Sequence, residues 1–236
     1  DSLLDGSATY GVMALENKVA GSIIPNYGLI DSNNLHIVGE EYLNIHHHLM
    51  ALPGQQIKDI KEVWSHPMAL LQCKEFFKKH PHIKLVEDVD TAEVAKRIAK
   101  GTLEGIAAIA PKIAAEIFEL EVIEDEIQTI KDNATRFVIV QTHEPSNGID
   151  QINKSSLKFQ LNHKRGGLAA ILNVLSDCKM NLTKIQSLPV IEKPWKYSFF
   201  VDVTFDEYEE YQKAVKIIEI MAEEFKILGA YKNGRK

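Results

Sequence analysis

A threonine and an arginine stand side by side at Thr135-Arg136, directly before the apolar segment 137–141. A guanidinium can form two parallel hydrogen bonds with a carboxylate, and a neighbouring hydroxyl can donate a hydrogen bond or a proton. The pair therefore suits a small carboxylate ligand. The plainer alternative is that Thr135 is an ordinary β-branched strand residue and Arg136 a solvated charge, and spacing alone does not exclude it.

Other polar residues fall where ligands commonly bind in open α/β sheets, at the carboxyl ends of strands and in the first turns of helices. Glu16-Asn17 ends the first apolar strand, Ser65-His66 precedes one helix, and Asp90-Thr91 precedes another. Simple helix capping is an alternative explanation for Asp90-Thr91.

Histidines and cysteines offer reactive side chains whose surroundings favour a structural role. His46, His47 and His48 look like a metal cluster by type, but adjacent strand residues face opposite sides. Neither their spacing nor a partnered acid in the sequence supports a metal site. Cys73 and Cys178 each lie in an apolar helical pattern. We therefore expect core thiols, no disulfide framework, and a reducing cytoplasm as the compartment.

The 236 residues are enough for one large domain or two modest ones, and 45% hydrophobic with 25% charged residues is typical of a globular protein. A net charge of −6 argues against a nucleic-acid or anionic-membrane surface, because both require concentrated positive charge. No apolar run approaches the roughly 18 residues that a membrane helix needs. We expect no nucleic-acid partner and no membrane partner.

Up to about residue 141, short apolar strands alternate with helices, which predicts an α/β domain with a mainly parallel sheet. Helices are predicted to begin at Ser65-His66-Pro67, at Asp90 and at Pro111, and the second ends at Gly101, where a left-handed residue belongs. The predicted strands are Tyr10–Leu15, Lys84–Asp88, Gly105–Ala110 and Phe137–Gln141.

Residues 143–153 are rich in proline, glycine, serine and asparagine without periodicity, which predicts a linker. Beyond it the pattern predicts a ferredoxin-like βαββαβ unit. Its elements are a strand at 155–161, a helix at 167–178, strands at 181–189 and 195–205, a long helix at 206–225 and a last strand at 228–232.

Four motifs in the first part resemble the prephenate dehydratase family, in the order that the family has them. Asn133-Ala134-Thr135-Arg136-Phe137 is similar to its Asn-x-Thr-Arg-Phe motif, and Glu16-Asn17 with Gly21 looks like its Glu-Asn-Ser segment. The helix start at 65–73 is similar to its His-Pro-Gln-Ala-Leu-x-Gln-Cys motif, and 91–93 to its Ser-Thr-Ala-Glu turn. Lys18, Met68 and Asp90 depart from these patterns.

The second part resembles the ACT regulatory domain that follows the catalytic domain in this family. Gly166-Gly167-Leu168 looks like the Gly-Ala-Leu helix start that holds phenylalanine. Segment 186–189 falls where the family has Glu-Ser-Arg-Pro, but Gln186 and Leu188 replace the Glu and the Arg, which leaves the strength and sign of a phenylalanine response open.

The resemblance implies a catalytic domain at 1–142, the linker at 143–153 and an ACT domain at 154–236. The catalytic domain would be two-lobed, like periplasmic binding proteins, with the ligand between the lobes. The family's first strand and its Gly-x-x-Gly-Thr-Tyr loop have no counterpart, so we expect that the sequence begins inside this domain.

The implied activity is the decarboxylating dehydration of prephenate to phenylpyruvate in phenylalanine biosynthesis, without a metal or organic cofactor. Thr135 would be the catalytic hydroxyl, and Arg136 would clamp a substrate carboxylate. The other substrate-binding residues implied are Glu16, Asn17, Gly21, His66, Thr91 and Phe137.

Regulation by L-phenylalanine would act between two ACT domains, which requires at least a homodimer and allows a homotetramer. The residues implied to contact the effector are Gly166, Gly167, Leu168, Asn181 and Leu182. Two alternatives remain open: an arogenate dehydratase, which performs the same elimination on the amino-acid analogue, and a non-enzymatic sensor of amino acids or carboxylates.

Overall fold

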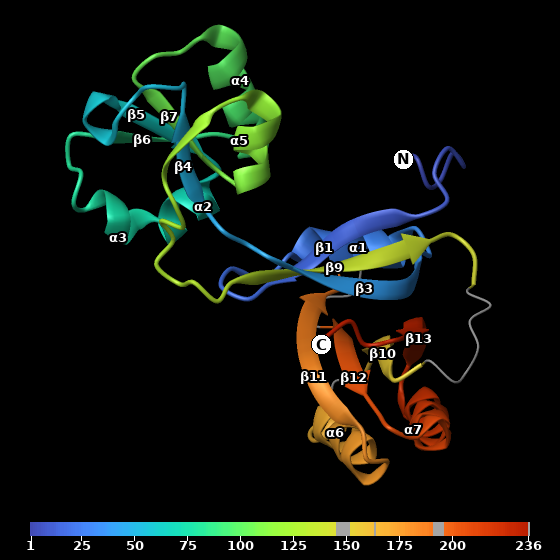
Figure 1. Cartoon of the computed structure of the whole chain (residues 1–236). Coiled ribbons are helices and arrows are strands. Elements are labelled where there is room, and N and C mark those ends of the chain that lie inside the picture. The colour runs from blue at the N-terminus through green and yellow to red at the C-terminus, as the bar shows by residue number, and fades with distance from the viewer. Residues whose placement is uncertain (145–151, 163, 191–195, 236) are drawn as a thin grey trace. The chain divides into compact units, whose positions relative to one another are not determined.

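The computed structural model describes residues 1–144, 152–162, 164–190 and 196–235 (Figure 1). The chain forms two compact units. Unit 1 comprises Asp1–Asn17, Gly21–Leu43 and Thr135–Lys236, and unit 2 comprises Lys18–Ala20 and Asn44–Ala134. Unit 2 is thus almost entirely an insertion into unit 1, and the two-lobed α/β organisation predicted for the catalytic part is confirmed. Most of the predicted linker, residues 145–151, lies outside the described residues.

The first sheet of unit 1 has the strand order β2-β1-β9-β3. Its strands are β1 (Gly11–Asn17), β2 (Gly21–Ser22), β3 (His36–Asn44) and β9 (Ala134–Gln141), and helix α1 (Ile24–Ser32) accompanies them. Strand β9 pairs with β1 antiparallel although more than a hundred residues separate them. The pairing brings the end of β1 beside the beginning of β9.

Unit 2 is built on a five-stranded sheet with the order β6-β5-β7-β4-β8. Its strands are β4 (His48–Ala51), β5 (Glu62–Ser65), β6 (Lys84–Glu87), β7 (Ile106–Ala110) and β8 (Glu121–Glu124). Its helices are α2 (Pro67–Gln72), α3 (Lys74–Phe77), α4 (Ala92–Gly101) and α5 (Lys112–Phe118), with a 3₁₀ turn at Ile57–Asp59.

Helices cover both faces of the unit 2 sheet, because its central strands alternate side chains between two cores. Along β7, Ala107 and Ile109 pack with residues of α2 and α3, whereas Ala108 and Ala110 pack with residues of α4 and α5. Such double burial explains why these strands are apolar throughout rather than alternating.

The prediction of a mainly parallel sheet is wrong. In the unit 2 sheet the pairs β5–β6 and β5–β7 are parallel, and helices lie in the connections between those strands. Strand β4 is antiparallel to both β7 and β8, and β1 is antiparallel to β9 and β2.

The C-terminal part of unit 1 is the predicted βαββαβ unit. Its elements are β10 (Lys154–Gln160), α6 (Gly167–Asp177), β11 (Asn181–Pro189), β12 (Tyr197–Thr204), α7 (Tyr208–Met221) and β13 (Glu224–Tyr231). They form an antiparallel sheet of order β11-β12-β10-β13, called here the C-terminal sheet. Residue 195, the expected first residue of β12, is outside the described residues.

Several boundaries differ from those predicted, among them the ends of α7 and α4. Helix α7 ends at Met221 rather than at residue 225, because Glu224 and Phe225 already pair with Gln160 and Phe159 of β10. The left-handed residue after α4 is Thr102, with φ +46°, rather than Gly101. None of the helices in the described ranges combines the length and the apolar character that crossing a bilayer requires.

The C-terminal sheet is covered on both faces. Helices α6 and α7 pack on one face over Leu157 and Phe159 of β10. Residues of the first sheet pack on the other face, where Val138 and Val140 of β9 share a core with Phe200, Leu228 and Tyr231. The C-terminal sheet therefore shares a hydrophobic core with the strand that carries Thr135 and Arg136.

Close contact between β13 and β3 leads to a stability prediction. A Cβ placed on Gly229 would lie 2.0 Å from the backbone oxygen of Ile37, whereas one on Gly39 would meet only a side-chain methyl at 3.5 Å. We expect Gly229→Ala to lower the free energy of unfolding by about 1–3 kcal/mol through overpacking. Gly39→Ala is the control and should change it by less than about 1 kcal/mol. Chemical denaturation measures both, and equal effects would contradict the close approach.

Candidate active site

Asn17 and Thr135 face each other where β1 and β9 meet. They are register partners in the antiparallel pair, and the Nδ2 group of Asn17 donates a hydrogen bond of 2.9 Å to the Oγ1 atom of Thr135. Both side chains are buried. Since Oγ1 accepts this hydrogen bond, the hydroxyl hydrogen of Thr135 is directed away from Asn17 and toward whatever acceptor lies beyond it.

Thr135 and Arg136 do not point to the same place, because consecutive strand residues face opposite sides of a sheet. Phe137 shares the face of Thr135. Arg136 shares the face of Val138 and Val140, which the C-terminal sheet covers. The side chain of Arg136 is 4% exposed. The expectation that Thr135 and Arg136 act on one ligand therefore fails on strand geometry.

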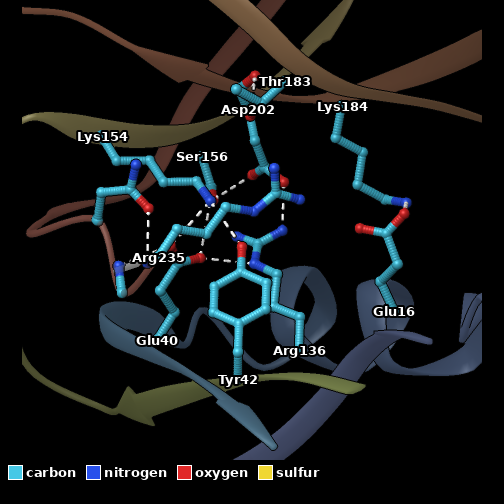
Figure 2. A network of polar contacts seen from close by, with 12 residues as sticks. Glu16, Glu40, Tyr42, Arg136, Lys154, Ser156, Thr183, Lys184, Asp202 and Arg235 are labelled. Carbon is cyan, nitrogen blue, oxygen red and sulfur yellow. Dashed lines mark hydrogen bonds and ion pairs between the residues drawn. The ribbon is translucent and has the colours of Figure 1, made fainter. Parts of the chain in front are cut away.

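The guanidinium of Arg136 is held by partners from three strands, as Figure 2 shows. Its Nε donates to Glu40 of β3 at 2.6 Å, its NH1 donates to Asp202 of β12, and its NH2 donates to the hydroxyl of Tyr231 on β13 at 2.8 Å. Lys154 of β10 adds a second cation, 2.8 Å from Glu40. The predicted role of Arg136 as a substrate clamp is corrected here, because its guanidinium is buried and already paired with these acceptors.

The charges of this cluster balance, which is the condition for burying them. Burial alone would lower the pKa of Arg136, but Asp202, Tyr231 and Glu40 together raise it, so the guanidinium stays charged. Burial, and then the charge of Asp202, raises the pKa of Tyr231 well above its usual range, so this residue is a neutral hydrogen-bonding phenol.

Glu16 and Gly21 lie beside Asn17, on the short antiparallel pair of β1 and β2. Glu16 pairs with Ser22 in the register, and Asn17 pairs with Gly21, whose φ of +84° is a backbone conformation that favours glycine. The carboxylate of Glu16 forms an ion pair with Lys184 of β11, with 2.7 Å between Oε1 and Nζ. Glu16, Asn17, Gly21 and Thr135 are thus neighbours in unit 1.

His66 and Thr91 belong to unit 2, at the carboxyl ends of two parallel strands. His66 follows β5 and begins α2, where its Nδ1 accepts a hydrogen bond of 3.2 Å from the backbone of Met68. Thr91 follows β6 and begins α4, while the adjacent Asp90 caps that helix by accepting from the backbone of Glu93 at 2.8 Å. Because β5 and β6 pair in parallel with Ser65 opposite Glu87, both helix starts lie at one edge of the sheet.

An open depression lies at this edge of unit 2 and is lined by His66, Pro67, Glu87, Asp88, Val89 and Arg97. Arg97 is ion-paired with Asp88, and its hydrogen bond lowers the pKa of that carboxyl. A cavity of about 10 Å³ in unit 1, beside Tyr27 and Asp202, is too small for an organic ligand. Unit 2 therefore offers an accessible recess bordered by a helix start.

The histidine triplet and Cys73 have structural partners. His47 is buried and its Nε2 lies 2.9 Å from Gln72, while His48 lies 3.0 Å from Asp125 and His46 lies 3.1 Å from Glu126. Burial lowers the pKa of His47 and raises that of the Cys73 thiol to about 12. Cys73 is a core thiol, as predicted. Among the described residues, no group of three metal-binding side chains is present.

The residues expected to contact an effector lie on the C-terminal sheet and α6. Gly166 precedes α6 with φ +81°, and a Cβ on Gly167 would meet no atom closer than 3.8 Å. Leu168 and Leu182 pack against the same core, and Asn181 is exposed at the beginning of β11. This arrangement leaves room beside the α6 start.

The comparisons with known proteins agree with this organisation. A family model described as prephenate dehydratase matches residues 1–145, more than half of the chain. The chain belongs to the prephenate dehydratase family.

The matched relatives carry related activities in their names. The chain is 36% identical over 230 residues to arogenate dehydratase/prephenate dehydratase 2, chloroplastic, of Arabidopsis thaliana, covering 93% of the chain and 60% of that protein. It is 30% identical over 228 residues to the bifunctional chorismate mutase/prephenate dehydratase of Escherichia coli K12, covering 96% and 59%. The chain thus spans about 60% of the length of these curated relatives.

Among solved structures, the prephenate dehydratase of Arthrobacter aurescens in complex with L-Phe matches with a TM-score of 0.87 at 26% identity, covering 99% of this chain and 78% of that one. The similarity extends through the C-terminal sheet, because 99% of the chain is covered. The family and the two-part architecture are therefore shared with a protein that binds phenylalanine.

Several residues of the buried cluster escaped the sequence analysis. Asp202 carried a usable signal, because it stands inside the apolar strand segment Phe199-Phe200-Val201 and Val203, where a charge is rarely buried unless it is paired. Glu40 and Lys154 had no such signal, since each stands at a position that a solvated residue could occupy. Only the register of four strands brings them together.

The corrected role of Arg136 gives a prediction. Arg136→Met leaves Asp202 buried without its cation and Glu40 with Lys154 alone, so we expect a loss of about 3–5 kcal/mol of unfolding free energy. Arg97→Met removes a more exposed pair with Asp88 and should cost at most about 1 kcal/mol. Denaturant titration compares the two. An Arg136→Met protein of unchanged stability that binds substrate weakly would restore the clamp interpretation.

Proposed function

We propose that the chain catalyses the decarboxylating dehydration of prephenate to phenylpyruvate. The observation that carries the proposal is the Asn17–Thr135 hydrogen bond, in a chain that belongs to the prephenate dehydratase family. It orients a hydroxyl at the junction of β1 and β9, where the family motif stands. In the reaction, the bond from the ring to the carboxylate breaks and its electron pair completes the aromatic ring as hydroxide leaves.

Thr135 is proposed to donate its hydrogen bond to the departing oxygen. A threonine hydroxyl is a weak acid, so its contribution is stabilisation of developing negative charge rather than full transfer of its own proton. Asn17 strengthens this donor, since hydrogen bonds in a chain polarise one another. The leaving hydroxide takes up one proton and becomes water.

The other residues proposed to bind substrate, as the family resemblance implies, are Glu16, Gly21, His66, Thr91 and Phe137. Arg136 is excluded from this list by its buried partners. A departing carboxylate should not be held by a strong ion pair, because that contact would stabilise the substrate and be lost in the transition state. Neutral donors such as Thr91 suit the requirement, and no cofactor is needed.

The substrate could also be arogenate, which undergoes the same elimination. The Arabidopsis relative carries both activities in its name. Discrimination must occur at the side chain of the substrate, which ends in a keto acid in prephenate and an amino acid in arogenate. Initial rates with each substrate, followed as phenylpyruvate or phenylalanine, decide between the two dehydratases, and turnover of neither favours the sensor alternative.

We further propose the domain division 1–142, 143–153 and 154–236, with L-phenylalanine as effector of at least a homodimer and the cytoplasm as the compartment. The Arthrobacter relative was solved with L-Phe, and it aligns with the ACT-like part of this chain. An effector that binds one quaternary arrangement better shifts the population toward it, typically with a coupling of about 1–3 kcal/mol.

Thr135→Ala tests the catalytic assignment. We expect kcat to fall at least about 10²-fold, because a positioned donor is lost while the fold remains. Thr135→Ser keeps a hydroxyl and should retain more activity than the alanine variant. Thr129→Ala, at an exposed threonine of unit 2, is the control and should leave kcat unchanged. A fully active Thr135→Ala protein would remove the assignment.

Gly167→Val tests the effector site. The backbone at Gly167 tolerates a Cβ, so the added side chain should fill the space beside the α6 start and weaken phenylalanine binding at least about tenfold. Isothermal titration calorimetry measures the Kd. Gly28→Val, at a glycine of α1 with open space around it, is the control. Unchanged binding in Gly167→Val would place the effector elsewhere.

A further inference from the structure

Lys184 connects the C-terminal sheet to the strand pair that holds Asn17. Its side chain is 10% exposed, and its Nζ lies 2.7 Å from Oε1 of Glu16 and 2.9 Å from the hydroxyl of Ser22. Figure 2 shows Lys184 and Glu16 extended toward each other, beside but separate from the Arg136 cluster. A single ammonium group thus bonds both members of a cross-strand pair of β1 and β2.

The next register pair is Asn17 with Gly21, and Asn17 donates to Thr135. Lys184 therefore acts on the hairpin β1–β2 one residue before the asparagine that orients the proposed catalytic hydroxyl. The connection of this hairpin, Lys18–Ala20, groups with unit 2, where the backbone N–H of Lys18 donates to Ala134 at 2.8 Å. The two bonds of Lys184 are to Glu16 and Ser22 on the paired strands of the hairpin, which belong to unit 1.

A β-bulge gives Lys184 its direction. The register of β11 with β12 shifts between Leu182 and Lys184, so that Thr183 is the extra residue, and its hydroxyl donates to the backbone oxygen of Asp202 at 3.1 Å. Bulges re-aim side chains and are common beside functional sites. Here the bulge separates Asn181-Leu182, the proposed effector contacts, from Lys184.

We infer that Lys184 is a positioning residue for Asn17 and Thr135, and that it transmits effector binding at Asn181-Leu182 to them. This inference rests on the proposed dehydratase function. Movement of β11 at the bulge shifts Lys184, Lys184 shifts Glu16 and Ser22, and the hairpin then changes the direction of the Asn17 amide. The C-terminal sheet is in this view part of the machinery that orients the catalytic hydroxyl.

The energy of the ion pair separates this role from simple stabilisation. Glu16 is 33% exposed, and a partly exposed pair contributes roughly 0–1 kcal/mol to folding. Removing Lys184 should therefore leave the protein folded. Lys226 supplies a matched control, since it also comes from the C-terminal sheet and contacts the first part of unit 1. Its Nζ lies 3.5 Å from Asp31 in α1 and 2.8 Å from Asn34, which follows that helix.

The experiment compares Lys184→Met, Lys184→Arg and Lys226→Met in the full chain. We measure kcat and KM for the dehydratase substrate with and without L-phenylalanine, the phenylalanine Kd by calorimetry, and the thermal midpoint. We expect Lys184→Met to lower kcat about 10- to 100-fold, as other residues that orient a functional group do. Its phenylalanine Kd should stay within about threefold of wild type while phenylalanine no longer changes its rate.

Lys184→Arg should restore most of kcat, and Lys226→Met should match wild type in rate and in response. A Lys184→Met protein with wild-type kcat and response would overturn the inference, as would equal losses in Lys184→Met and Lys226→Met with lowered thermal midpoints. A wild-type rate that phenylalanine leaves unchanged would refute the transmission step. A wild-type chain that turns over neither prephenate nor arogenate would instead refute the proposed function.

Discussion

The buried ion cluster around Arg136 is the constraint on which unit 1 depends. Two cations, Arg136 and Lys154, and two carboxylates, Glu40 and Asp202, lie together with almost no exposure. Each is tolerable only because the others are present, since an isolated buried charge costs several kcal/mol. Their strands belong to both the first sheet and the C-terminal sheet, so the cluster fixes how these two sheets pack against each other.

This requirement explains the composition of β10. Lys154, Ser156 and Lys158 alternate with Ser155, Leu157 and Phe159, a pattern that ordinarily indicates one solvated face. In the structure both faces are buried, and the polar face meets Glu40, Asp202 and Asp31. The polar residues make the interface specific, while Val138, Phe200 and Leu228 supply its apolar area.

Much of the fold followed from the sequence where the local signals were strong. The βαββαβ order, the strand 181–189 and the start of α6 were predicted from periodicity, and the structure confirms them. Strands β2, β5 and β8 were not predicted, because their short patterns resemble loops. The site was predicted only in part. Asn17 and Thr135 form the contact that the motifs suggested. Side chains alternate between the faces of a strand, which argued against a metal site at His46–His48, and the same alternation places Thr135 and Arg136 on opposite faces.

The insertion of unit 2 into unit 1 affects the order in which the chain can fold during synthesis. Residues 44–134 are contiguous and contain both faces of their own sheet, so this unit can close its cores as soon as it emerges. The first sheet must wait for β9, and the Arg136 cluster must wait until β12 and β13 have been synthesised. Until then, Glu40 and the apolar face of β3 have no native cover, so β3 is open to non-native contacts while the chain is being made.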